Sequence, residues 1–193
     1  MAYYFSKLGA SLIISARREN ELQRVKSNCF NSERVEIFTL DFSDPDALYE
    51  RVTKYMSSQN KKIDILVNNA GISMRAQFLD YHFENHKIMM NVNYLSQVAI
   101  TKAVVPSMVE NKSGQIVFVN SMQGKIAVPV RTAYSASKHA LAGFADALRS
   151  EMSDLGLHVT SLFPGYIKTN LSKNALSSGK GEKFGKVDPS IGQ

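Results

Sequence analysis

The most constraining feature of the sequence is an alternation of short apolar segments with longer segments of helical periodicity. Such an alternation predicts βαβ units, whose right-handed crossovers give a parallel sheet with helices on its faces. Continuous apolar runs such as residues 116–119 are typical of strands buried on both sides. The predicted strands are residues 10–15, 35–40, 63–67, 115–119 and 158–163, and the predicted helices are residues 1–8, 19–26, from 44 onward, 83–110 and 132–155. We therefore expect an α/β fold with a doubly wound parallel sheet, a Rossmann-like three-layer sandwich.

Composition excludes several other classes of protein. The 193 residues are 44% hydrophobic and 21% charged, which favours one globular domain with a core. No apolar run is long enough to span a bilayer, and the N-terminus lacks the pattern of a secretory signal. The single cysteine, Cys29, excludes an internal disulfide framework. His82 and His86 lie four residues apart without a third ligand, so no metal site is predicted.

Polar or glycine-containing turns follow every predicted strand. In a doubly wound sheet, the carboxyl ends of the strands form the edge at which ligands bind. These turns therefore predict one extended site along that edge. The residues concerned are Arg17 and Arg18, Asp41, Asn68 to Gly71, Asn120 and Ser121, and Pro164-Gly165 with Thr169.

Tyr134 and Lys138 stand at i and i+4 on a predicted helix, so they are neighbours on one helical face. A phenol needs about 4 kcal/mol to lower its pKa from ~10 to ~7. A cation about 4 Å away supplies about that much at an effective dielectric constant of ~20. Ser121 could hydrogen-bond a substrate carbonyl. This set suits carbonyl reduction or alcohol oxidation, with the hydride coming from a cofactor.

A simpler interpretation of the same residues stays open. Tyr134 and Lys138 could be incidental neighbours on a surface helix, and Ser121 could be a strand-end hydroxyl that bonds backbone. A serine hydrolase is excluded because Ser121 does not lie in a G-x-S-x-G turn.

Taken together, these residues resemble the short-chain dehydrogenase/reductase family in both order and spacing. The resemblance spans about residues 1–171. Within the family, the segment from Met1 to Arg18 and the pair Tyr94-Leu95 resemble the subgroup that holds type 1 11-beta-hydroxysteroid dehydrogenase and the dehydrogenase/reductase member 7 proteins. The matching residues are Asp41, Asn68-Asn69-Ala70-Gly71, Asn93, Ser121, Tyr134-x-x-x-Lys138 and Pro164-Gly165-x-x-x-Thr169.

The resemblance implies a catalytic role for four residues. Tyr134 gives or takes the proton, and Lys138 lowers the pKa of that phenol and binds the nicotinamide ribose. Ser121 orients the substrate carbonyl, and Asn93 completes a proton relay through water. The implied reaction interconverts a carbonyl and an alcohol.

The resemblance also implies a dinucleotide site. Residues 15–18, Ser-Ala-Arg-Arg, indicate which coenzyme binds. An NAD enzyme would have an acidic residue at this position for the ribose 2′-hydroxyl. This chain has Arg17 there instead, which would accommodate a 2′-phosphate, so the sequence predicts NADP(H). An alternative is that both arginines only face solvent on the next helix. The other implied contacts are Asp41 with the adenine, Asn68, Ala70 and Gly71 on the adenosine side, and Gly165, Ile167 and Thr169 near the nicotinamide amide and pyrophosphate.

The family pattern is broken at the start of the chain. The first strand and its Gly-rich, phosphate-binding turn are missing, and the similar string at 179–185 follows no strand. Without that strand, the strands at 10–15 and 63–67 would each have an unpaired edge. We therefore expect a truncated dinucleotide-binding and catalytic domain at 1–171, followed at 172–193 by a flexible tail or incomplete substrate loop. Such a chain is expected to bind NADP weakly or not at all.

Two further expectations concern function and partners. The alternative to an enzyme is a catalytically inactive family fragment that serves as a binding or regulatory module. The net charge of +6 is not accompanied by a nucleic-acid module, so no nucleic-acid partner is predicted. The resemblance implies a homodimer or tetramer through the helices at 90–110 and 132–155. The sequence leaves the localisation of the intact protein open: we expect a cytoplasmic location for this chain, and the resemblance allows an endoplasmic reticulum membrane location for a full-length relative.

Overall fold

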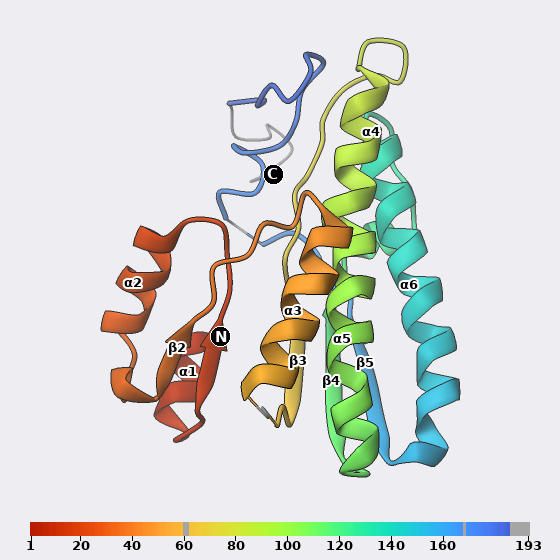
Figure 1. The fold of residues 1–193 in the computed structure, drawn as a ribbon. Helices are drawn as coiled ribbons and strands as arrows, with labels where there is room; N and C mark the ends of the chain where they lie inside the picture. Colours follow the sequence, from red (N-terminus) through yellow and green to blue (C-terminus); the bar gives the residue numbers. More distant parts are fainter. Residues whose placement is uncertain (60–61, 168, 186–193) are drawn as a thin grey trace. The chain divides into compact units, whose positions relative to one another are not determined.

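The computed structural model describes residues 1–59, 62–167 and 169–185 (Figure 1). The chain forms two compact units, one from Met1 to Phe42 and one from Ser43 onward. None of the helices in the described part of the chain combines the length and the hydrophobicity that a bilayer crossing requires.

The first unit contains a two-stranded parallel sheet. Strands β1 and β2 pair with Leu12 opposite Val35, and the pairing continues as the Leu40 N–H donates to the Ala16 carbonyl over 3.2 Å. The carboxyl ends of the two strands therefore lie at one edge, as predicted for parallel neighbours. The elements of this unit are α1 (Ala2–Lys7), β1 (Leu12–Ile14), α2 (Glu19–Ser27), the 3₁₀ turn η1 (Ser32–Arg34) and β2 (Val35–Ile37).

The second unit is a three-stranded parallel sheet with the order β3-β4-β5. Helix α3 packs on α5, and α6 packs on α4 and β5 (Figure 1). Its helices are α3 (Pro45–Gln59), α4 (Phe83–Met90), the π-helical segment η2 (Asn91–Leu95), α5 (Ser96–Glu110), the 3₁₀ turn η3 (Met122–Gly124), α6 (Thr132–Met152) and the 3₁₀ turn η4 (Ser153–Leu155). Its strands are β3 (Ile65–Asn68), β4 (Gly114–Val119) and β5 (Leu157–Leu162).

The predicted parallel α/β architecture is confirmed, but it is divided between two sheets. All pairings between the named strands are parallel, and among the described residues these strands form two sheets, β1-β2 and β3-β4-β5. Strand β4 also differs from the expected two-sided burial. Ile116 and Phe118 are fully buried, whereas Val117 and Val119, which alternate with them, are only half-buried. An apolar run alone does not reveal whether both faces of a strand are covered, because strand side chains alternate between the faces.

The predicted single helix at 83–110 is interrupted by the π-helical segment η2. Asn93 lies in this segment and directs its amide out of the helix to the backbone of Ile72. A π-helical turn contains one extra residue, and the apolar periodicity of the flanking helices does not indicate where such a turn occurs. Such turns are frequent at functional sites.

Candidate active site

Tyr134 and Ser121 come together from different elements of the second unit. Ser121 follows the carboxyl end of β4 and Tyr134 lies in the first turn of α6, and their side chains share a hydrogen bond. Tyr134 is 7% exposed and packs in a cluster with Met74, Met89 and Leu176. Burial raises the pKa of the Tyr134 phenol, while the Ser121 hydrogen bond and the charge of Arg131 act in the opposite direction.

Lys138 lies one helical turn beyond Tyr134, with its Nζ 6.0 Å from the centre of the Tyr134 ring. The ammonium donates a hydrogen bond to the Val119 carbonyl over 3.1 Å. Burial lowers the pKa of Lys138 to about 8. The resemblance to the family predicts that Lys138 lowers the pKa of Tyr134. In the structure, the pKa of Tyr134 is raised instead. Burial is the largest cause of the raised pKa of Tyr134, and the groups that act against it are Ser121 and Arg131, not Lys138.

Asn93 links three parts of the site through one buried amide. Its Oδ1 accepts from the Ile72 N–H over 2.8 Å, and its Nδ2 donates to the Ile72 carbonyl and to Ser137 Oγ, each over 3.0 Å. Asn93 is fully buried. The side chain therefore fixes the loop after β3 against α6, beside Lys138.

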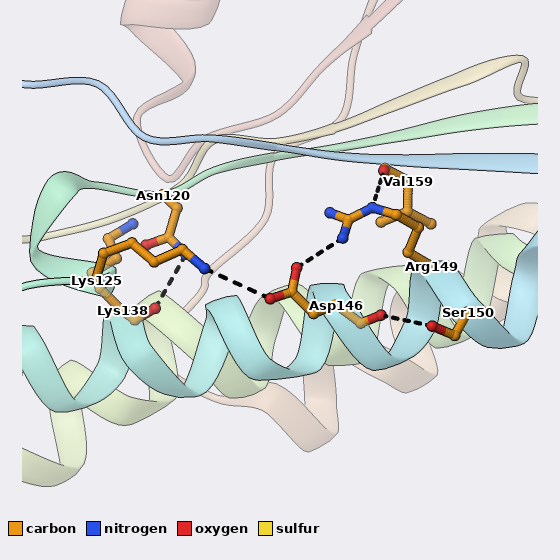
Figure 2. A network of polar contacts seen from close by, with 7 residues as sticks. All are labelled: Asn120, Lys125, Lys138, Asp146, Arg149, Ser150 and Val159. Carbon is orange, nitrogen blue, oxygen red and sulfur yellow. Dashed lines mark hydrogen bonds and ion pairs between the residues drawn. The ribbon is translucent and has the colours of Figure 1, made fainter.

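The turn after β4 is bonded to α6 through Asn120. The Asn120 Oδ1 accepts from the Ser121 N–H over 2.9 Å. Its Nδ2 donates to the Lys138 carbonyl over 3.1 Å, the bond drawn in Figure 2. Ser121 Oγ also accepts from the Gln123 N–H over 3.2 Å. The strand-end serine thus bonds backbone, as the simpler interpretation expects, and it also reaches Tyr134.

A polar network holds the middle of α6 to its neighbours (Figure 2). Asp146 receives a hydrogen bond from Arg149 over 2.8 Å and an ion pair from Lys125 over 3.7 Å. Arg149 in turn donates to the Val159 carbonyl of β5 over 2.9 Å. The helix that carries Tyr134 is therefore tied to the turn after β4 and to β5.

Gly124 stands where the turn after β4 approaches α6 most tightly. A Cβ at this position would lie 2.7 Å from Asn120 Oδ1 and 2.8 Å from the Lys138 carbonyl oxygen.

We expect Gly124→Ala to lower the free energy of unfolding by about 1–3 kcal/mol, because backbone must move to relieve the clash. Gly143 of α6 has nothing within 4 Å of its Cβ position. Gly143→Ala is therefore the matched control, and it should raise that free energy by about 0.5–1 kcal/mol in the same denaturant titration. Equal effects of the two substitutions would contradict the tight approach.

The predicted cofactor residues after β3 lie beside the same cluster. Asn68 is buried and donates to Thr101 Oγ1 over 3.0 Å, and the Ala70 carbonyl accepts from Gln97 Nε2 over 2.8 Å. A Cβ on Gly71 would lie 3.4 Å from Asn93 Oδ1 and 3.7 Å from Lys138 Nζ. The backbone of Gly71 therefore lies close to the polar side chains of Asn93 and Lys138.

The residues predicted near the nicotinamide follow β5. The Pro164 carbonyl accepts from the Met122 N–H over 3.2 Å, which brings this turn next to Ser121. Gly165, Ile167 and Thr169 are exposed. A Cβ at Gly165 would meet no atom within 4 Å.

Arg17 and Asp41 form a separate group in the first unit. Both side chains are exposed. Arg17 directly follows Ala16 and Asp41 directly follows Leu40, and the backbones of Ala16 and Leu40 are joined by a hydrogen bond. The structure therefore brings these two predicted adenosine contacts to one edge of the β1–β2 sheet.

Arg131 is a site residue that the sequence analysis missed. Its guanidinium donates to Ser73 Oγ over 2.7 Å and to the Met74 carbonyl over 3.3 Å. The residue before it, Val130, has a φ of +58°, which is strained for a β-branched residue. The only available signal was the position of a cation three residues before Tyr134.

Comparison with known proteins identifies the class. A family model described as short chain dehydrogenase matches residues 1–179. The chain belongs to the short-chain dehydrogenase/reductase family. Within it, the chain is 43% identical to Dehydrogenase/reductase SDR family protein 7-like of Drosophila melanogaster, covering 97% of this chain and 59% of the relative. It is 41% identical to human Dehydrogenase/reductase SDR family member 7, covering 92% and 54%. The predicted family and member 7 subgroup are confirmed, and the chain spans about 60% of the length of these relatives.

Solved structures show the same fold. A short-chain dehydrogenase from Streptomyces avermitilis superposes with a TM-score of 0.79 at 26% identity, over 89% of this chain and 62% of that one. The structure described as ElxO with NADP bound gives a TM-score of 0.77 at 26% identity, over 86% and 67%.

Proposed function

We propose that the protein is an oxidoreductase that interconverts a carbonyl and an alcohol with NADP(H). The observation that carries this proposal is the group of half-buried Ser121 with buried Tyr134 and Lys138, in which a hydroxyl, a phenol and an ammonium lie near the carboxyl end of β4. Membership of the short-chain dehydrogenase/reductase family supports it.

The side chains suit the transfer of a proton to a carbonyl oxygen. Because burial raises the pKa of Tyr134, the phenol keeps its proton at neutral pH and can donate it. Ser121 can hydrogen-bond the same oxygen and stabilise the charge that develops there. Lys138 and Asn93 hold the helix and loop around the phenol. A bound nicotinamide supplies the hydride, since no side chain can donate one.

The residues present fit part of a dinucleotide site. In the second unit, Lys138 would hold the nicotinamide ribose. In the first unit, taken by itself, Arg17 would hold a 2′-phosphate. Similar structures are described with NADP bound in one case and with NADH in another, so the family fold by itself does not select the coenzyme. NADP(H) is favoured because residues 15–18, which follow β1, contain no acidic residue to bind the ribose 2′-hydroxyl of NAD.

Replacement of Arg17 tests the coenzyme. In the full-length protein, we expect Arg17→Ala to raise the Kd for NADPH at least ~10-fold, since one charge-assisted contact to a phosphate is worth about 1.5–3 kcal/mol. The Kd for NADH should change less than ~2-fold. Arg24→Ala is the control, because Arg24 forms an exposed ion pair with Glu21 on α2. Equal losses for the two coenzymes would assign Arg17 a purely structural role.

The direct test is turnover. A panel of carbonyl compounds is offered to the full-length protein with NADPH, and loss of NADPH absorbance is followed. We expect turnover of at least one carbonyl class. Coenzyme binding without turnover of any of them would favour the alternative, an inactive family member that acts as a binding or regulatory module.

A further inference from the structure

The segment after β5 folds back onto the Tyr134 cluster. It contains no helix or strand within residues 169–185, yet Leu176 is only 8% exposed. The Leu176 N–H donates to the Ser73 carbonyl over 2.8 Å, and its carbonyl accepts from the Arg75 N–H over 2.9 Å. The Leu176 side chain packs in the same cluster as Tyr134. The segment therefore contributes an apolar side chain to the surroundings of the proposed proton donor.

A buried amide on helix α4 also holds this segment in place. Asn85 of α4 is fully buried, and its Nδ2 donates to the Ser177 carbonyl over 3.0 Å and to the Gly179 carbonyl over 2.9 Å. Its Oδ1 accepts from the Gly181 N–H over 2.9 Å. Both donors and one acceptor of the amide therefore go to one short stretch of backbone. An aspartate cannot make the two donor bonds, and a leucine can make none.

Helix α4 connects this amide to the active site. Asn85 and Met89 stand at i and i+4, so they share one face of the helix, and Met89 packs against Tyr134. Asn93 then donates to Met89 Sδ and to the Ile72 carbonyl, each over 3.0 Å. The same face of one helical element thus contacts the segment after β5, Tyr134 and the loop after β3.

We propose that Asn85 is a positioning residue that seats residues 175–181 beside Tyr134, so that Leu176 forms an apolar wall for the carbonyl substrate. The role rests on the proposed function, because it concerns the substrate of the same site. It goes beyond the proposed function because Asn85, which does not belong to the Ser121, Tyr134 and Lys138 group, would determine the shape of the substrate-binding surface.

The test combines a structural and a kinetic measurement on the full-length protein. Asn85→Asp keeps the size of the side chain and removes both donors, and Asn85→Leu is a second variant without buried charge. We expect amide hydrogen exchange in residues 175–184 to become about 10-fold faster or more in both, while exchange in β3, β4 and β5 stays unchanged. The KM for the carbonyl substrate should rise about 10-fold, with kcat within about 3-fold. Asn20→Asp, an exposed change in the first turn of α2, is the matched control and should alter neither quantity.

The outcomes separate the two proposals. Unchanged exchange in residues 175–184 of a folded Asn85→Leu protein would overturn the seating role. Faster exchange with an unchanged KM would overturn the effect on substrate. If the unmodified protein turns over no carbonyl compound, the proposed function fails and the substrate role fails with it, while the exchange data still decide whether Asn85 holds the segment.

Discussion

The Tyr134→Phe protein is expected to lose turnover by a factor of about 10² to 10⁴, because it lacks the only phenol hydroxyl that shares a hydrogen bond with Ser121 in the described site. Phenylalanine keeps the ring that packs against Met74, Met89 and Leu176. The fold and the coenzyme Kd should therefore change little, with the coenzyme Kd within about 2-fold. The measurement is kcat with NADPH and a carbonyl substrate, alongside coenzyme binding by calorimetry.

Tyr49→Phe provides the matched control for this substitution. Tyr49 lies on α3 and is 38% exposed, so removal of its hydroxyl should leave kcat within about 2-fold. Equal activities of Tyr134→Phe and the unmodified protein would remove Tyr134 from the chemistry. A Tyr134→Phe protein that fails to fold would contradict the claim that the ring, rather than the hydroxyl, supports the packing.

Lys138→Met should abolish turnover and at the same time stabilise the fold. The Lys138 side chain is 4% exposed, and burial brings its pKa from the ordinary 10.5 to about 8. That fall corresponds to about 3 kcal/mol of destabilisation when the amine is charged. Methionine has a similar length and no charge to desolvate. We therefore expect the free energy of unfolding at pH 7 to rise by about 2–3 kcal/mol, once loss of the bond to the Val119 carbonyl is included.

The pH dependence of this difference has a definite sign. Below about pH 8 the amine is protonated in both the folded and the unfolded state, so the full destabilisation is present. Between pH 8 and 10.5 the folded state releases its proton while the unfolded state keeps it, and the unmodified protein gains stability relative to Lys138→Met. Denaturant titrations at pH 7 and pH 10 should therefore show a smaller difference at the higher pH.

Lys102→Met separates burial from a general effect of removing a lysine. Lys102 is exposed on α5, so its loss should change stability by less than about 0.5 kcal/mol at either pH. A Lys138→Met protein that is less stable than the unmodified one at pH 7 would show that the ammonium has more partners than the Val119 carbonyl. Together with the Tyr134 result, these data would separate the proton donor from the cation beside it.

The family pattern was readable from the sequence because it consists of residue types at fixed spacings. Tyr134 and Lys138 are one helical turn apart, and Ser121 directly follows a strand, so local geometry already brings each to the edge of the sheet. Their catalytic roles are proposals, whereas their position at one edge of the sheet could be predicted from the order of the strands and helices alone.

The sequence by itself determined the alternation of strands and helices, the parallel pairing that follows from it and the family to which the chain belongs. Only the tertiary structure decided the direction of the Tyr134 pKa shift, the π-helical turn at Asn93 and the hydrogen bonds from Asn85 to the segment after β5. The physical reason is that periodicity and spacing report neighbours within one element. Desolvation and hydrogen bonds between residues some 90 positions apart, such as Asn85 and Ser177, depend on how separate elements pack.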